Sequence, residues 1–298
     1  MLYDVKVINS DALSALCQND TYQAQELFRK NAKINPSSVS FNNLGVFYIS
    51  EGIYTLDNSF RTAKKLGVSY LEKARMIKPL NLSYLALGRV CFEDNDYNGA
   101  ICNFKKANAL KSEYGTLYNL ALSYYRNGMP ENAISSFKKA LLACSEESYF
   151  DTYASYLFSL IQVDMKMCHE QIASLFDDDT NNTAIERFVL AYLCDDMHLA
   201  EHLINRMLCD FDVGIEVTAM VFDCLIRYGK ENKAEEYLNQ KVQILKETMN
   251  YFFKQNIKKY KEIFLHKEYR KEVIATYQYI APLVEQCCYY GCMMHNPL

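Results

Sequence analysis

Apolar residues recur at three- and four-residue spacing along most of the chain, which is the period of an amphipathic helix. Leu87 and Cys91 lie on one face of a first predicted helix, and Ala100 and Phe104 lie on one face of a second. Residues 93–98 between them have the residue types of a turn and a helix N-cap. The pattern therefore predicts two helices joined by a tight turn.

The same pattern returns 33 residues further along, where Ala133 takes the place of Ala100 and Phe137 that of Phe104. Small residues such as Gly88 and Ala100 would let the backbones of two helices approach closely. The phenylalanines would then fill the space against the next pair. A repeat of this length predicts a stack of α-hairpins, each burying its apolar face against its neighbours.

The repeat resembles the tetratricopeptide repeat, a helix–turn–helix unit of about 34 residues with an aromatic, Leu-Gly, Tyr, Ala, Phe, Ala and Pro at fixed spacing. The matching residues are Phe41, Leu44, Gly45, Tyr48, Leu71, Ala74 and Pro79, with Ala24, Phe28 and Pro36 upstream and Phe150, Tyr153, Ala154 and Leu157 downstream. One unit is ten residues too long between Gly45 and Ala74. The surplus lies around residues 52–59, and a Leu-Gly-x-x-Tyr unit lengthened in this way is similar to the related Sel1 repeat.

We therefore expect an all-α fold, a superhelical solenoid of tetratricopeptide-like helix hairpins with a C-terminal helical cap. Well-matched repeats are expected over residues 1–160, degenerate helix pairs over residues 161–240 and capping helices over residues 241–298. The last predicted helix carries Val273, Tyr277, Ile280 and Val284 at helical spacing. A stacked array exposes an apolar face at each end, so a cap is the main interpretation and a partner-binding helix is the alternative.

Composition favours a folded helical protein, with 50% apolar and 23% charged residues and only five prolines and ten glycines. The net charge of −4 argues against attraction to nucleic acid. No run approaches the roughly 18 apolar residues that span a membrane, and the first residues do not look like a signal peptide. We expect a cytoplasmic protein without nucleic-acid or membrane partners, in which the eleven cysteines are reduced.

The resemblance implies a peptide-binding groove on the concave side, lined by the first helix of each pair. The implied groove residues are Asn42, Asn43, Val46, Ile49, Leu85, Arg89, Phe92, Tyr118, Asn119, Leu122, Tyr125 and Arg126. Asn43 and Asn119 occupy a position at which the family often has an asparagine, whose amide offers a donor and an acceptor to an extended peptide. Ala86 stands at that position in the middle unit and interrupts the series.

These residues predict a non-enzymatic adaptor or scaffold that binds a protein or peptide partner and needs no cofactor. Arg89 and Arg126 are the only candidate cations in the implied groove, so the Lys-rich carboxylate clamp of chaperone-tail binders is missing. The alternative from another class is a ligand-responsive regulatory switch that acts through a partner protein.

Two further patterns contain metal-ligand residue types. His198, Glu201 and His202 spell H-x-x-E-H, a zinc-hydrolase motif, but Ala200 falls at the small packing position of a repeat helix. A metal-dependent enzyme is therefore a minor alternative. Near the C-terminus, three or four zinc ligands could come from Cys287 or Cys288, Cys292 and His295. No paired-cysteine knuckle elsewhere completes a familiar module, so the sequence assigns neither a metal nor a catalytic residue.

Overall fold

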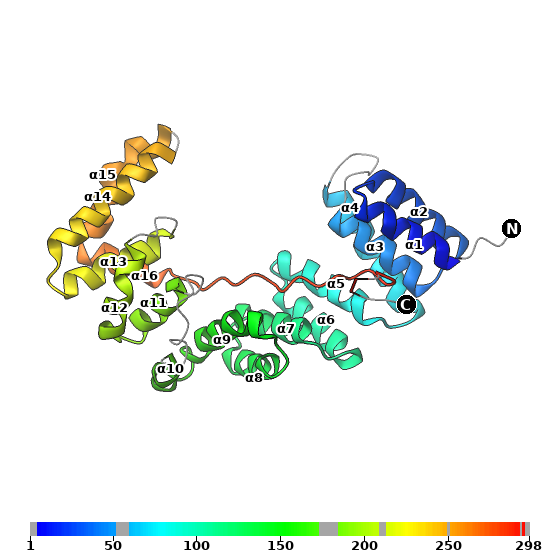
Figure 1. Ribbon diagram of the computed structural model, residues 1–298, viewed down its shortest axis with the longest axis horizontal. Helices are drawn as coiled ribbons and strands as arrows, with labels where there is room; N and C mark the ends of the chain where they lie inside the picture. Colours follow the sequence, from blue (N-terminus) through cyan, green and yellow to red (C-terminus); the bar gives the residue numbers. More distant parts are fainter. Residues whose placement is uncertain are drawn as a thin grey trace. The chain divides into compact units, whose positions relative to one another are not determined.

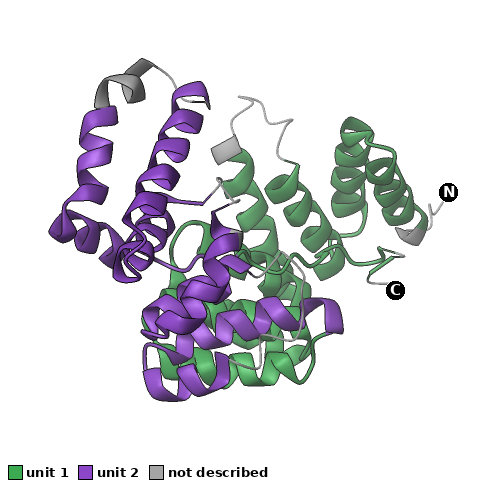
Figure 2. Cartoon of the chain, turned by 60° about the vertical axis from the view of Figure 1, so that its left-hand side comes forward, with its two compact units in different colours: residues 1–144, 282–298 green, residues 145–281 purple. Residues whose placement is uncertain are grey.

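The computed structural model describes residues 5–51, 60–172, 184–208, 213–248, 251–292 and 294–295. In these ranges the regular secondary structure is α-helical, which confirms the all-α prediction (Figure 1). The surplus residues 52–59 of the long unit lie outside the described ranges. The chain divides into two compact units, residues 1–144 with 282–298 and residues 145–281 (Figure 2).

Unit 1 contains four helix hairpins, each made of two helices that pack against each other. Its helices are α1 (Val5–Cys17), α2 (Thr21–Ile34), α3 (Ser38–Ser50), α4 (Phe60–Ile77), α5 (Asn81–Glu93), α6 (Tyr97–Leu110), α7 (Tyr114–Arg126) and α8 (Pro130–Leu141). The odd-numbered members are the first helices of the predicted repeat pairs.

The turns inside the hairpins follow from local hydrogen bonding. Asn95 adopts a left-handed backbone conformation with φ of 60°, and the carboxylate of Asp96 then caps α6 by accepting from the N–H of Gly99 at 2.9 Å. Asn19 and Asp20 repeat this arrangement before α2. The turn predicted over residues 93–98 is thus confirmed.

Small residues set the distance between the two helices of a hairpin. A Cβ atom at Gly67 of α4 would lie 2.7 Å from the carbonyl oxygen of Gly45 in α3, and a Cβ at Gly88 would meet the ring of Phe104 at 2.6 Å. The predicted packing residues Ala100 and Phe104 are fully buried, as are their counterparts 33 residues later, Ala133 and Phe137. The repeat therefore describes the core of unit 1.

Unit 2 continues with helices of more variable length. They are α9 (Glu146–Leu160), α10 (Met165–Ile172), α11 (Ala184–Leu193), α12 (Met197–Met207), α13 (Ile215–Arg227), α14 (Glu231–Thr248), α15 (Tyr251–Leu265) and α16 (Lys267–Ala275). The last of them, α16, returns to pack on α13.

A buried ion pair fastens α16 to α13. Asp223 accepts hydrogen bonds from Nε of Arg270 at 2.9 Å, from Nε of Arg227 at 2.7 Å and from the hydroxyl of Tyr192 at 2.8 Å. Burial alone would raise the pKa of Asp223, but the hydrogen bonds from Tyr192 and Arg270 and the two guanidinium charges outweigh it and lower that pKa. Arg270 also donates to the carbonyl of Phe264, so its buried charge is well satisfied.

The predicted C-terminal helix is wrong beyond Ala275. Val273 is helical, but Tyr277, Ile280 and Val284 lie in an extended segment that follows α16. In unit 2 this segment is held by Tyr279, whose ring stacks on Phe158 at 3.9 Å and whose hydroxyl is 3.0 Å from that of Ser155. Pro282 disfavours a helix here, because proline has no N–H and restricts the residue before it.

The hairpin packing predicts the effect of a single methyl group. Gly67→Ala should lower the free energy of unfolding by about 1–3 kcal/mol, because the added Cβ overlaps the backbone of α3. Urea denaturation measures this change, with Ser50→Ala on the exposed side of α3 as the control. Equal stability of the two variants would contradict the close approach of α3 and α4.

The ion pair predicts a pH-dependent stability in unit 2. Asp223→Asn should cost about 3–5 kcal/mol, since it leaves the buried charge of Arg270 without its partner. Because the folded-state pKa of Asp223 is lowered, its contribution is complete above the unfolded-state pKa of about 3.9 and is lost as pH falls through the folded-state value.

Urea melts between about pH 6 and pH 3 should therefore show a steeper loss of stability in the wild type than in Asp223→Asn. Glu268→Gln, at an exposed position of α16, is the control and should follow the wild type. Parallel declines of the wild type and Asp223→Asn would refute the assigned role of this carboxylate.

Candidate peptide-binding groove

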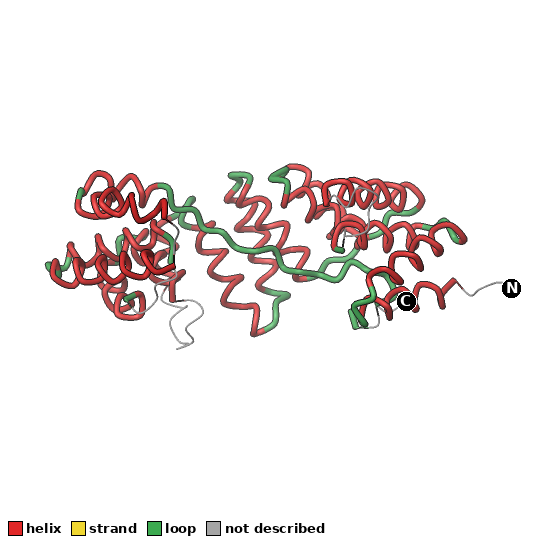
Figure 3. Tube along the Cα trace, turned by 90° about the horizontal axis from the view of Figure 1, so that it is seen from above, coloured by secondary structure: helices red, strands yellow, loops and turns green. Residues whose placement is uncertain are grey.

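An extended segment of the protein itself lies against the first helices of the unit 1 hairpins. The C-terminal tail, residues 282–292 with 294–295, contacts α7 through Val284, α3 through Cys288, and α5, α3 and α1 through Tyr290. Figures 1 and 3 show the segment as a long stretch without helix. The tail therefore runs antiparallel to the order of the hairpins. It makes its polar contacts chiefly through its backbone.

Asn119 of α7 binds both backbone groups of one tail residue. Its Nδ2 donates to the carbonyl oxygen of Val284 at 3.0 Å, and its Oδ1 accepts from the N–H of Val284 at 2.8 Å. The side chain of Asn119 is almost completely buried. Its amide thus satisfies two peptide groups that an extended chain would otherwise leave without partners.

Asn43 of α3 makes the same pair of bonds with Tyr290. Its Nδ2 donates to the carbonyl oxygen of Tyr290 and its Oδ1 accepts from the N–H of Tyr290, both at 2.8 Å. Asn9 of α1 supports this pair, since its Oδ1 accepts from Asn43 at 2.8 Å and its Nδ2 donates to the same Tyr290 carbonyl at 3.1 Å.

Asn9 was missed by the sequence analysis, although the signal was present. It lies 34 residues before Asn43, which is the spacing of the repeat. The tetratricopeptide-like residues of the first hairpin begin only at Ala24, so no Leu-Gly pair marks the asparagine position on its first helix.

Asn42 adds a third backbone contact. Its Nδ2 donates to the carbonyl oxygen of Cys288 at 2.8 Å, and its Oδ1 accepts from the hydroxyl of Ser83 at 2.7 Å. Asn42 and Asn43 are also joined at 3.1 Å. The buried polar side chains of α3 and α5 therefore form one network whose outer face is the backbone of the tail.

The interruption at Ala86 fits the geometry of the tail. Val284 and Tyr290 are six residues apart, and Asn119 and Asn43 are two hairpins apart, so the tail advances three residues per hairpin. The midpoint of the interval is Cys287. The hairpin between Asn43 and Asn119 carries Ala86 at the asparagine position. The tail is therefore bound in pairs at the hairpins on either side but not by an asparagine at this one.

The side chains of the tail enter distinct surroundings. The ring of Tyr289 stacks on Phe28 with centroids 5.7 Å apart and joins the apolar core of the first two hairpins. The hydroxyl of Tyr290 donates to Oδ1 of Asn81 at 2.8 Å. Gly115 makes room for Gln286, because a Cβ there would lie 2.6 Å from the amide carbon of that residue.

Cys288 is buried near Arg89, the one predicted groove cation that reaches the tail. Burial raises the pKa of the Cys288 thiol to about 12, although the nearby charge of Arg89 favours the thiolate. This thiol is therefore neutral near pH 7 and acts as a small apolar side chain.

The other predicted groove residues contribute to packing. Phe92 meets the ring of Tyr97 edge-on, Arg126 donates to the Tyr97 hydroxyl at 3.0 Å, and Tyr118 packs edge-on against Phe137. A further group comprises Val46, Leu85 and Leu122, which are buried, and Ile49 and Tyr125, which are half-buried.

The ligand-type side chains of the two candidate metal patterns are placed differently. His198 and His202 are exposed on α12, and Glu201 forms an ion pair with Lys230. In the tail, the ligand atoms of Cys287, Cys292 and His295 all lie within 4.8 Å of one another. Within the described ranges, this is the one group of three or more ligand-type side chains so placed.

Among the residues that the structure describes, no helix combines the length and the apolar character needed to cross a bilayer.

Comparisons with known proteins agree with the fold. A TPR repeat-containing protein of Methanocaldococcus jannaschii is 30% identical over 164 residues, which are 53% of this chain and 27% of that protein. No protein-family model matches the chain. The chain spans only about a quarter of that relative, so the similarity concerns the repeats.

A solved tetratricopeptide repeat protein from Parabacteroides merdae has a TM-score of 0.56 at 12% identity, covering 91% of this chain and 97% of the other. The structure of Pseudomonas aeruginosa PilF has a TM-score of 0.46 at 17% identity, covering 84% and 96%. The likeness to the Parabacteroides merdae protein shows that the fold is that of a helical-repeat solenoid. More specifically, its hairpins are tetratricopeptide-like, as the sequence resemblance implied.

Amide hydrogen exchange tests the contacts of the tail residue by residue. The N–H groups of Val284 and Tyr290 should exchange more slowly than that of Glu285, which is exposed. Asn119→Ala should speed exchange at Val284 by about fivefold or more, because a hydrogen bond worth about 1 kcal/mol or more is lost.

The control is Asn103→Ala on α6, where the amide bonds its own helix at Gly99. It should leave both tail amides protected. Equal exchange rates at Val284, Glu285 and Tyr290 in the wild type would show that the tail does not occupy the groove in solution.

Proposed function

We propose that the concave face of unit 1 binds an extended segment of a partner protein in the manner in which it now holds its own tail. The observation that carries this proposal is the paired donor and acceptor contact of Asn43 and Asn119 with single backbone residues. Such contacts recognise an extended peptide without reading its side chains. The protein would thus act as a non-enzymatic adaptor.

The tail indicates the chemistry of the partner segment. A ligand would need two residues with free N–H and C=O groups six positions apart, as Val284 and Tyr290 are. It would also need an aromatic ring at the Tyr289 position to stack on Phe28, preceded by a small side chain such as that of Cys288. These two side-chain positions provide selectivity beyond the backbone contacts.

The hydroxyl of Tyr289 is buried without a hydrogen-bond partner in the described part of the chain. A partner with phenylalanine at this position would keep the stacking on Phe28 without burying a hydroxyl.

The position of the tail in the groove also supports a second function, that of a switch. Because the tail is covalently attached, it competes at a high effective concentration, and a partner binds only to the fraction of molecules in which the tail is released. Displacement of the tail by a peptide would make the protein a ligand-responsive switch. The released tail would then be free to contact another protein.

Peptide binding in trans tests the adaptor function. In the full-length chain, Val284→Pro and Tyr290→Pro together remove the two N–H groups that donate hydrogen bonds to Asn119 and Asn43. This released variant should bind a fluorescent peptide of residues 282–295 with a Kd at least about tenfold lower than the wild type, because the internal competitor is weakened. Fluorescence anisotropy under reducing conditions measures the difference.

The matched control is Glu285→Pro, which places proline in the extended tail at a residue that neither asparagine contacts. It should bind the peptide as weakly as the wild type. Adding Asn43→Ala and Asn119→Ala to the released variant should abolish the gain. Undiminished binding after those two changes would refute the groove as the peptide site.

A further inference from the structure

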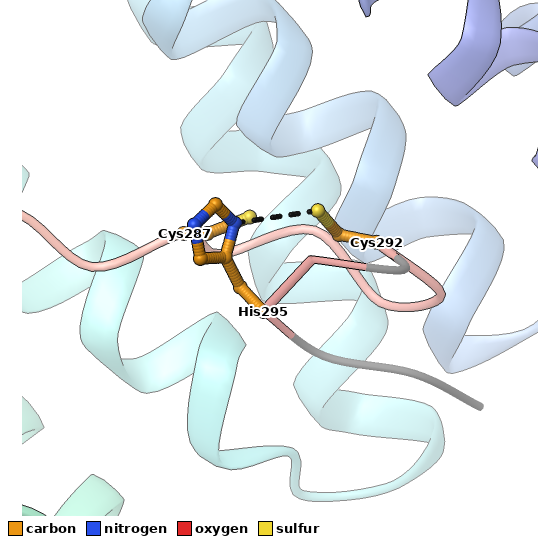
Figure 4. Close-up of side chains that lie close together, drawn as sticks. All are labelled: Cys287, Cys292 and His295. Carbon is orange, nitrogen blue, oxygen red and sulfur yellow. Dashed lines mark hydrogen bonds between the residues drawn. The ribbon is translucent and has the colours of Figure 1, made fainter.

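Three metal-ligand side chains meet at the end of the tail. Cys287 and Cys292 lie on either side of a turn at Gly291, where φ is +80°, and His295 follows three residues later (Figure 4). The Sγ atom of Cys292 is 3.4 Å from Nδ1 of His295, and the two thiols and the imidazole converge on one point. The two cysteines are half-buried and the histidine is exposed.

The spacing of these atoms suits a tetrahedral zinc ion. Zinc–sulfur and zinc–nitrogen bonds of about 2.3 Å and 2.0 Å at the tetrahedral angle put two ligand atoms about 3.5–3.8 Å apart. The separation of 3.4 Å between Cys292 and His295 is close to this value, and the outer limit of 4.8 Å for the group requires only small side-chain movements.

A fourth ligand has room to bind. The three side chains help to line a pocket of about 570 Å³ between the tail and α1. Cys17 and Glu51 line the same pocket and carry further ligand atoms. The site thus has the three protein ligands and the free position that zinc accepts.

Not every cysteine of the tail belongs to the cluster, since the adjacent Cys288 lies apart from it. Successive side chains of an extended chain point to opposite sides, so Cys287 faces the pocket while Cys288 is buried near Arg89. Cys288 is not a member of the cluster. It therefore provides a matched control one residue away.

We propose that Cys287, Cys292 and His295 bind a zinc ion that closes the end of the tail into a loop. Binding would displace the protons of both thiols, because zinc takes cysteine as the thiolate. The closed loop would include Tyr289 and Tyr290, the residues that contact Phe28 and Asn43. Zinc would therefore hold the tail in the groove, a consequence that rests on the proposed function, whereas zinc binding itself does not.

The test uses the full-length protein purified without an affinity tag and reloaded with zinc under reducing conditions. Elemental analysis should find about one zinc per chain in the wild type, and competition with a chromogenic chelator gives the affinity. Cys287→Ser, Cys292→Ser and His295→Ala should each weaken binding by at least about tenfold, and Cys288→Ser should stay within about twofold of the wild type.

Cobalt substitution gives an independent readout, since tetrahedral cobalt bound by thiolate has intense absorption bands. These bands should appear in the wild type and in Cys288→Ser and be lost in Cys287→Ser. Circular dichroism confirms that each variant is folded. Substoichiometric zinc in the wild type, a disulfide between Cys287 and Cys292 in the reduced preparation, or an equal loss in Cys288→Ser would each overturn the site.

Amide exchange at Tyr290, measured with and without a zinc chelator, tests whether bound zinc holds the tail in the groove. Faster exchange after zinc removal supports the role in holding the tail. If Tyr290 exchanges at the same rate in zinc-loaded and in chelator-treated protein, zinc does not hold the tail, although the zinc site itself stands. Protection at Val284 and Tyr290 in zinc-free protein tests the groove, so failure of the zinc site and failure of the proposed function give different results.

Discussion

The need of an extended backbone for hydrogen-bond partners governs the site in this protein. A helix satisfies its own N–H and C=O groups, whereas a tail lying on the wall of a solenoid must find partners there or remain in water. Asn43 and Asn119 supply them in pairs, at an interval that equals three tail residues per hairpin. Within each hairpin, close contacts such as that of Gly67 with Gly45 bring the two helices together.

The periodic features of the fold were predictable from the sequence. Ala100, Phe104 and the turn before Asp96 recur at a fixed offset, and the structure buries and caps them as the repeat requires. Asn43 was placed on a first helix by its position beside Leu44 and Gly45, and Asn119 by the 33-residue offset from Ala86. Local spacing and residue size were sufficient for these features, because each hairpin contacts mainly its neighbours.

The ligand of the groove could not be predicted in this way. Tyr277, Ile280 and Val284 are spaced as in a helix, and that spacing predicted one. The segment is extended because contacts more than a hundred residues away in sequence, between Tyr279 and Ser155 and between Val284 and Asn119, replace helical hydrogen bonds. No local pattern encodes such contacts. The convergence of Cys287, Cys292 and His295 likewise depends on a turn that helical periodicity did not suggest.

The central claim is that the tail occupies the groove of the intact protein. Nuclear Overhauser effects between the rings of Tyr289 and Phe28, measured in the reduced full-length chain, test it most directly. Stacked rings with centroids 5.7 Å apart should give clear cross-peaks between their ring protons. An absence of these cross-peaks, with the resonances of Tyr289 at the positions of an unstructured peptide, would contradict the account.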